Sequence, residues 1–209
     1  MGVAAPRRLH HSDSRDPKMI QPGDTLLNGV TGEELTFLET AASTGGEYVE
    51  LMCTVRPGGF VAAAHIHPSQ SETFTTVEGT LDLRIGRDHM RLEAGEGVTV
   101  LPGAPHKFWN DGAKPVVFRC VVRPALQFES LIETMFTLAA EGRTNRKGMP
   151  NPVRMAAIAR AHRDVIRLAG VPVWMQDAGT LAAMPLAHLL GYATPRPQAA
   201  RGRNPILAS

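Results

Sequence analysis

The sequence predicts a mainly β protein, a β-barrel with a C-terminal α-helical extension. Between Gln21 and Pro124, turn signals rich in glycine, proline and asparagine separate short β-rich runs, which is typical of a sandwich or barrel. The run Thr80–Ile85 alternates apolar and polar residues, as an antiparallel strand with one buried side does. After Pro124 the apolar spacing changes to that of helices.

These changes divide the 209-residue chain into four parts. Residues 1–20 are polar, basic and without periodicity, so we expect a disordered tail. Residues 21–124 form the barrel and residues 125–193 the helical extension. Residues 194–209 are rich in proline, alanine and arginine, and we expect a flexible tail. The length suits one domain with a sizeable core and an appendage.

Six strands are expected in the barrel region, each bounded by turn residues and rich in β-branched or aromatic side chains. In chain order they are Glu34–Thr40, Tyr48–Val55, Thr73–Val77, Leu81–Ile85, Gly97–Leu101 and Val116–Val122.

Three helices are expected in the extension. Leu126–Ala140 carries a long apolar face, which must be buried against the outside of a barrel sheet or against a second subunit; we expect a homodimer. A second helix begins at Pro152, with Asn151 as its N-cap, and ends at Gly170. A third covers about Ala178–Leu190, although Pro185 interrupts its pattern.

Composition argues against several classes of partner. The net charge is +2, and no apolar run of about 18 residues is present, so we expect neither nucleic-acid binding nor membrane insertion. Residues 143–167 carry seven basic side chains and one acidic one, which we interpret as the solvated side of an amphipathic helix. The N-terminus lacks a secretory apolar region, and the two cysteines form no framework, so we expect a cytoplasmic protein.

Two segments hold the residues that carry chemistry. The first reads Gly-X5-His-X-His-X4-Glu-X6-Gly and contains His65, His67 and Glu72. Because alternate residues of a strand point to the same face, the two imidazoles project together, and the following turn brings Glu72 beside them. The second segment, from Gly95 to Asn110, offers the imidazole of His106. Imidazoles and a carboxylate are ligands of divalent transition metals.

In spacing and order, the two segments resemble the two conserved motifs of the cupin superfamily, and the resemblance covers about residues 25–124. In the second segment, Leu101 stands where the motif has proline, and Pro102 follows it. The resemblance implies a cupin-type barrel, the double-stranded β-helix. It also implies one divalent metal, held by His65, His67, Glu72 and His106. Iron, manganese, nickel, zinc and copper all remain open.

Three imidazoles and one carboxylate leave about two positions open on an octahedral ion. Members of the family with this layout include dioxygenases, isomerases, lyases and cyclases. We therefore expect a metal-dependent enzyme, of the dioxygenase kind, for a hydrophobic, aromatic or polyketide-like small molecule. A redox-neutral isomerase, cyclase or lyase is the alternative, and a non-catalytic small-molecule-binding protein is the rival from another class.

The pocket wall follows from strand parity. Phe74, Thr76 and Phe108 lie an even number of residues from a metal ligand, so we expect them to line the cavity and contact the substrate. No inward lysine, aspartate or tyrosine is evident as a separate general base. Catalytic proton transfer is therefore assigned to Glu72 or to the metal.

Overall fold

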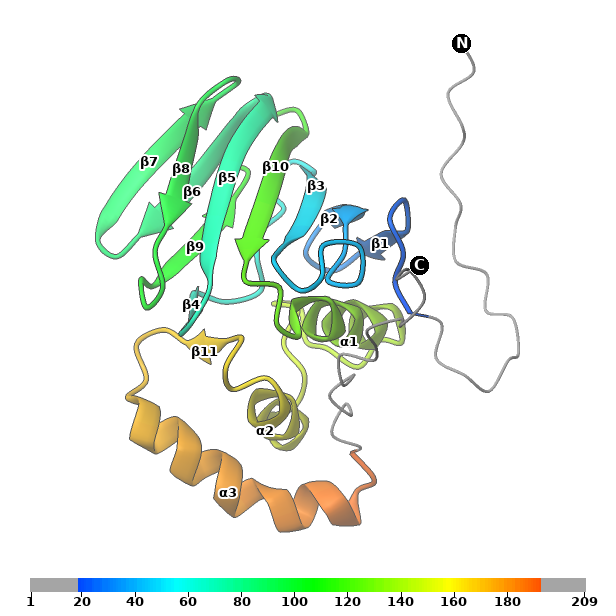
Figure 1. The fold of residues 1–209 in the computed structure, drawn as a ribbon. Coiled ribbons are helices and arrows are strands. Elements are labelled where there is room, and N and C mark those ends of the chain that lie inside the picture. Colours follow the sequence, from blue (N-terminus) through cyan, green and yellow to red (C-terminus); the bar gives the residue numbers. More distant parts are fainter. Residues whose placement is uncertain (1–18, 193–209) are drawn as a thin grey trace, which may run out of the picture.

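The computed structural model describes residues 19–192, so nearly all of the two expected tails lies outside the described residues. Two sheets face each other above a group of three helices (Figure 1). This confirms the predicted fold class, a mainly β barrel with a C-terminal helical extension. No helix among the described residues is long and apolar enough to cross a membrane.

Every strand pairing recorded between residues 19 and 192 is antiparallel. The larger sheet contains, in spatial order, β1 (Thr25–Asn28), β2 (Glu33–Glu39), β3 (Val49–Val55), β10 (Val116–Arg123), β5 (Ser71–Glu78) and β8 (Gly97–Val100). The smaller sheet contains β11 (Arg167–Leu168), β4 (His65–Ile66), β9 (His106–Trp109), β6 (Thr80–Ile85) and β7 (Asp88–Glu93).

The core lies between the sheets and follows from the period-2 pattern of the central strands. Along β3, alternate residues from Val49 to Val55 are buried, and along β10 the buried set runs from Val116 to Val122. The register places Phe118 opposite Cys53, so the two apolar rows meet on the inner face. Gly79 joins β5 to β6 with a φ of 79°, a conformation that a residue with a Cβ rarely adopts.

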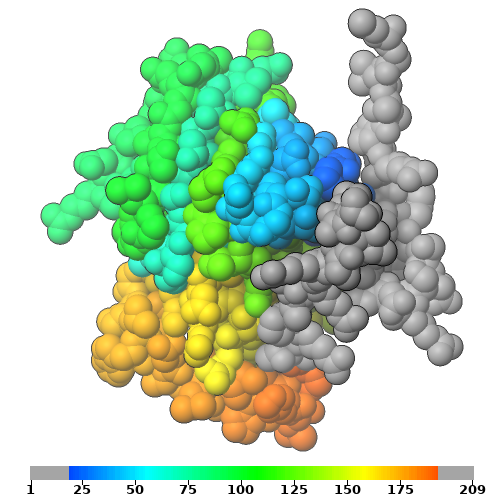
Figure 2. Space-filling view, in the orientation of Figure 1, coloured from blue at the N-terminus to red at the C-terminus, as the bar shows by residue number. Residues whose placement is uncertain are grey.

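The extension comprises α1 (Phe128–Ala140), α2 (Pro152–Ala161) and α3 (Val173–Leu189). Figure 2 shows it packed against one end of the β-structure, in yellow to orange. We expected the apolar face of Leu126–Ala140 to lie against the outside of a barrel sheet or against a second subunit. Instead it contacts β1 and turns Phe128, Leu131 and Phe136 toward the space between the sheets. The open end of a barrel exposes more apolar surface than its outer face, and this explains why the helix packs there.

Two helix boundaries differ from the expectation. The second helix begins as predicted, with the Asn151 side chain accepting from the Arg154 N–H at 3.0 Å, but it ends at Ala161 and not at Gly170. The chain then extends, and β11 pairs with β4. The unpaired edge of β4 thus overrides the helical periodicity of the sequence. The third helix starts at Val173, earlier than predicted, and tolerates Pro185 in its interior.

Candidate metal centre

Four buried side chains meet where β4, β5 and β9 come together. One potential ligand atom from each of His65, His67, Glu72 and His106 lies within 4.8 Å of every other. Strand pairing places His65 directly opposite His106, and their ring centroids are 4.3 Å apart. The carboxylate of Glu72 enters from the facing sheet: its Oε2 lies 2.8 Å from Nε2 of His106 and 3.2 Å from Nε2 of His67. All four residues predicted as ligands are therefore brought together.

Each imidazole is oriented by a backbone carbonyl. His65 and His106 each donate from Nδ1 to the carbonyl oxygen two residues earlier in the chain, at 2.9 and 3.0 Å. His67 donates from Nδ1 to the carbonyl oxygen of Val165, at 2.6 Å. A carbonyl only accepts, so the proton sits on Nδ1 in all three rings and Nε2 is left for the centre of the cluster. Such a second hydrogen bond is typical of metal-binding histidines.

The electrostatics favour the ligand forms of His65 and Glu72. Burial, followed by the neighbouring rings of His106 and His67, lowers the pKa of His65 to about 3, so this imidazole is neutral. Burial alone would raise the pKa of Glu72, but the contacts of its carboxylate with His106 and His67 outweigh burial and hold the pKa well below its ordinary value. A neutral imidazole and an ionised carboxylate are the states that bind a metal.

The residues present fit a divalent cation. Within the described part of the chain, Nε2 of His67 is buried without a hydrogen-bond partner. Burial would lower the pKa of His106, but the contact with Glu72 raises it above its ordinary value, because only a proton on Nε2 lets that nitrogen face a carboxylate oxygen at 2.8 Å. A metal ion takes the place of such a proton. The nitrogen and oxygen donors suit iron, manganese, nickel, zinc or copper, and they do not choose among these.

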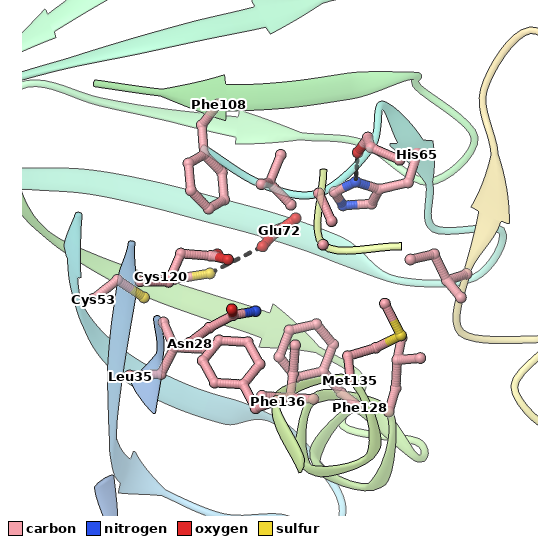
Figure 3. Close-up of a pocket in the computed structure, with 18 of the residues that line it drawn as sticks. Asn28, Leu35, Cys53, His65, Glu72, Phe108, Cys120, Phe128, Met135 and Phe136 are labelled. Atoms are coloured by element: carbon pink, nitrogen blue, oxygen red, sulfur yellow. Dashed lines mark hydrogen bonds between the residues drawn. The ribbon is translucent and has the colours of Figure 1, made fainter. Parts of the chain in front are cut away.

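A cavity of about 120 Å³ opens beside the cluster. His65, His67 and Glu72 form part of its wall, and most of the remaining wall is apolar. Figure 3 shows α1 closing one side with Phe128, Met135 and Phe136, while other wall residues come from the strands. The helical extension therefore completes the cavity.

The structure separates the three residues predicted to contact substrate. Phe108 lines the cavity, because β9 continues past His106 despite the Leu101 departure from the motif. Phe74 and Thr76 do not line it, and contact of any of the three with a substrate stays a prediction. Phe74 points inward, but it is fully buried against Phe108 and Phe118, with ring centroids 6.0 and 5.8 Å away. Parity determines the face of a strand to which a side chain points, but not how deeply it is buried.

Sequence reasoning missed two polar residues of the cavity wall, Asn28 and Glu33. The expected strand began at Glu34, one residue too late, so Glu33 was left outside it. Counted from its true start, β2 buries Glu33, Leu35 and Phe37 on its inner face and exposes Glu34. The same period-2 rule that identified the other strands would have found Glu33 with the correct boundary.

A third missed contact involves a thiol. Cys120 and Cys53 are both buried, and neither forms a disulfide, as expected of small core residues. In addition, Cys120 lines the cavity and donates from Sγ to Oε1 of Glu72 at 3.1 Å (Figure 3). This bond holds one carboxylate oxygen of Glu72 while the other faces the histidines.

Comparison with known proteins agrees with this picture. The family model described as "Cupin domain" matches residues 51–122, a segment that contains all four clustered residues. A search of curated proteins found no match.

Similar solved structures include an RmlC-like cupin from Shewanella frigidimarina (19% identity over 49% of this chain and 84% of that chain, TM-score 0.43). A protein with a double-stranded β-helix domain from Klebsiella pneumoniae gives 22% identity over 53% and 92%, with a TM-score of 0.42. A sugar phosphate isomerase of the cupin superfamily from Silicibacter pomeroyi gives 22% over 46% and 62%, with a TM-score of 0.41.

Proposed function

We propose that this chain, whose residues 51–122 match the cupin domain model, is a metal-dependent enzyme of the dioxygenase kind. Its substrate is a small hydrophobic molecule. One observation carries the proposal: three residues of the four-residue cluster, His65, His67 and Glu72, form part of the wall of a largely apolar cavity. When bound, a divalent transition metal supplies Lewis-acid chemistry and, for a redox-active ion, the activation of dioxygen.

The chain's own residues bind and shield the substrate. Phe108 and the aromatic side chains of α1 exclude water from the cavity, which strengthens polar interactions at the cluster. Apolar cavities of about 150 Å³ accept benzene, so a cavity of about 120 Å³ favours a molecule with one ring over a fused polyketide. Glu72 is ionised, and it is the group on which a proton released from the substrate would be received.

A redox-neutral isomerase, cyclase or lyase is the second candidate, and one observation favours it. Glu33 places a second carboxyl in the same cavity, and burial raises its pKa from 4.5 to about 7. A carboxyl with such a pKa both donates and accepts protons near neutral pH, as isomerisation and elimination require.

Metal analysis of the purified protein, followed by oxygen-uptake assays with single-ring phenols, tests both candidates. A redox-active metal, together with oxygen uptake that is lost in His106→Ala, supports the dioxygenase. Bound zinc, no oxygen uptake and conversion of the substrate together support the redox-neutral enzyme. His89→Ala is the matched control, because His89 is half exposed and lies outside the cluster. A protein that contains no metal after purification, and binds none when metal is added, would refute both candidates.

A further inference from the structure

We propose that the β1–β2 hairpin forms a hydroxyl-binding subsite in the cavity, made by the amide of Asn28 and the carboxyl of Glu33. Strand pairing sets these two residues directly opposite each other, and both are buried, with 5% and 8% of their surface exposed. Both line the same cavity as the metal cluster. Figure 3 shows Asn28 and His65 on opposite sides of this cavity.

The amide of Asn28 is held in one orientation. Its Oδ1 accepts from the backbone N–H groups of Val30 and Thr31, at 3.1 and 3.2 Å, and this caps the turn between the strands. The nitrogen Nδ2 is therefore directed away from the turn, and in Figure 3 the amide points into the cavity. Among residues 19–192, no hydrogen-bond partner is recorded for this nitrogen, so it presents a donor to a ligand.

The carboxyl of Glu33 is fixed in a similar way. Its Oε2 accepts from the hydroxyl of Thr31 at 2.6 Å, while Oε1 has no hydrogen bond recorded to any described residue. Neighbouring parts of the wall are apolar and include Leu35 and Leu51. A buried carboxyl oxygen without a partner costs free energy, and a ligand that donates to it recovers that cost.

A fixed amide donor beside a carboxyl acceptor matches one common functional group. Above about pH 7, where the Glu33 carboxyl is ionised, a hydroxyl group can accept from Nδ2 of Asn28 and donate to Oε1 of Glu33 at the same time. Because the cavity holds about one ring, the ligand class is a small phenol or a short apolar alcohol. The inference rests on the proposed function in one respect, that the cavity admits a small molecule.

Phenol and toluene are suitable probes, because they have nearly the same shape and differ in a hydroxyl and a methyl group. Their affinities are measured by calorimetry at about pH 8, where the Glu33 carboxyl is mostly ionised, on the purified, metal-loaded wild type and on Glu33→Met. The loss of one hydrogen bond should weaken phenol binding about tenfold and leave toluene binding unchanged or tighter. In Glu33→Gln the amide oxygen accepts from Thr31 and the amide nitrogen takes the place of Oε1, so the ligand-facing acceptor is lost and the preference for phenol should fall as in Glu33→Met. Glu34→Gln, on the exposed side of the same strand, is the matched control and should behave as wild type.

Asn28→Asp provides a second test in case Glu33→Met does not fold. It keeps the oxygen that caps the turn, replaces the amide donor by an oxygen, and should also lower the preference for phenol. Equal changes for both probes in all variants would overturn the subsite, as would a wild type that binds neither probe. The metal content of each protein is measured separately. A metal-free protein that still distinguishes phenol from toluene would refute the enzyme and retain the subsite.

Discussion

Glu33→Gln should stabilise the protein at alkaline pH and leave its stability at acidic pH nearly unchanged. Burial raises the pKa of Glu33 from 4.5 to about 7, so the folded state retains a proton that the unfolded state has already lost. Between these two values the folded state binds more protons, and the free energy of unfolding therefore falls as the pH rises. The contribution is fully favourable below about pH 4.5 and fully lost above about pH 7.

The size of this change in the free energy of unfolding follows from the difference between the pKa values of Glu33 in the unfolded and the folded state. It corresponds to about 3 kcal/mol, which the wild type loses between about pH 4.5 and about pH 7. The glutamine side chain cannot ionise, yet its amide oxygen can still accept from the hydroxyl of Thr31. At about pH 8 the variant should therefore be more stable by about 3 kcal/mol, and at about pH 5 the difference should be below about 1 kcal/mol.

Urea denaturation at several pH values measures this difference. A chelator is present throughout, so that metal release at low pH does not contribute. Other titrating groups affect both proteins equally and cancel when the two curves are subtracted. Glu34→Gln is the control, because this carboxyl is exposed on the opposite face of β2. Parallel curves for wild type and Glu33→Gln across the whole range would show that Glu33 is not protonated in the folded protein.

Four further outcomes are expected. His67→Ala should bind metal far more weakly, while its circular dichroism spectrum stays that of the wild type. Full metal occupancy in this variant would contradict the assigned ligands. Cys120→Ala frees one oxygen of the carboxylate ligand and should weaken metal binding about tenfold in chelator competition; unchanged affinity would count against this role. Truncation after Pro124 should give an aggregating or metal-free barrel, and a soluble, metal-loaded fragment would show that the helices are dispensable. Trp174, 71% exposed on α3, is our candidate for the homodimer interface: Trp174→Glu should give monomers in light scattering, whereas a monomeric wild type would refute the dimer.

Local patterns in the sequence were sufficient for much of the fold and for the cluster. The spacing of His65, His67 and Glu72 encodes one strand, a turn and the next strand, and all of these contacts are short in sequence. Period-2 burial likewise follows from neighbouring residues, as β3 and β10 show. These features depend on backbone geometry that a short segment determines by itself.

The features that were missed depend on distant segments of the chain or on how deeply a side chain is buried. The end of α2 is decided by the free edge of β4, and nothing near Val165 reveals that edge. The burial of Phe74 is decided by Phe108 and Phe118 from other strands. Glu33 is a different case, because only a one-residue error at the start of β2 hid it. Strand ends are set by pairing with a neighbour, which the sequence of one strand does not contain.

The helical extension contributes to the orientation of the histidine cluster as well as to the cavity wall. His67 finds the partner for its Nδ1 in Val165, 98 residues later, and β11 pairs with the strand that carries His65. Ordering so long a connection costs entropy that one hydrogen bond does not offset. The burial of α1 over the cavity offsets part of that cost, and metal binding, which needs His67 held in one orientation, offsets more. Barrel and extension therefore build the cluster and its cavity together, and a bound metal would stabilise both.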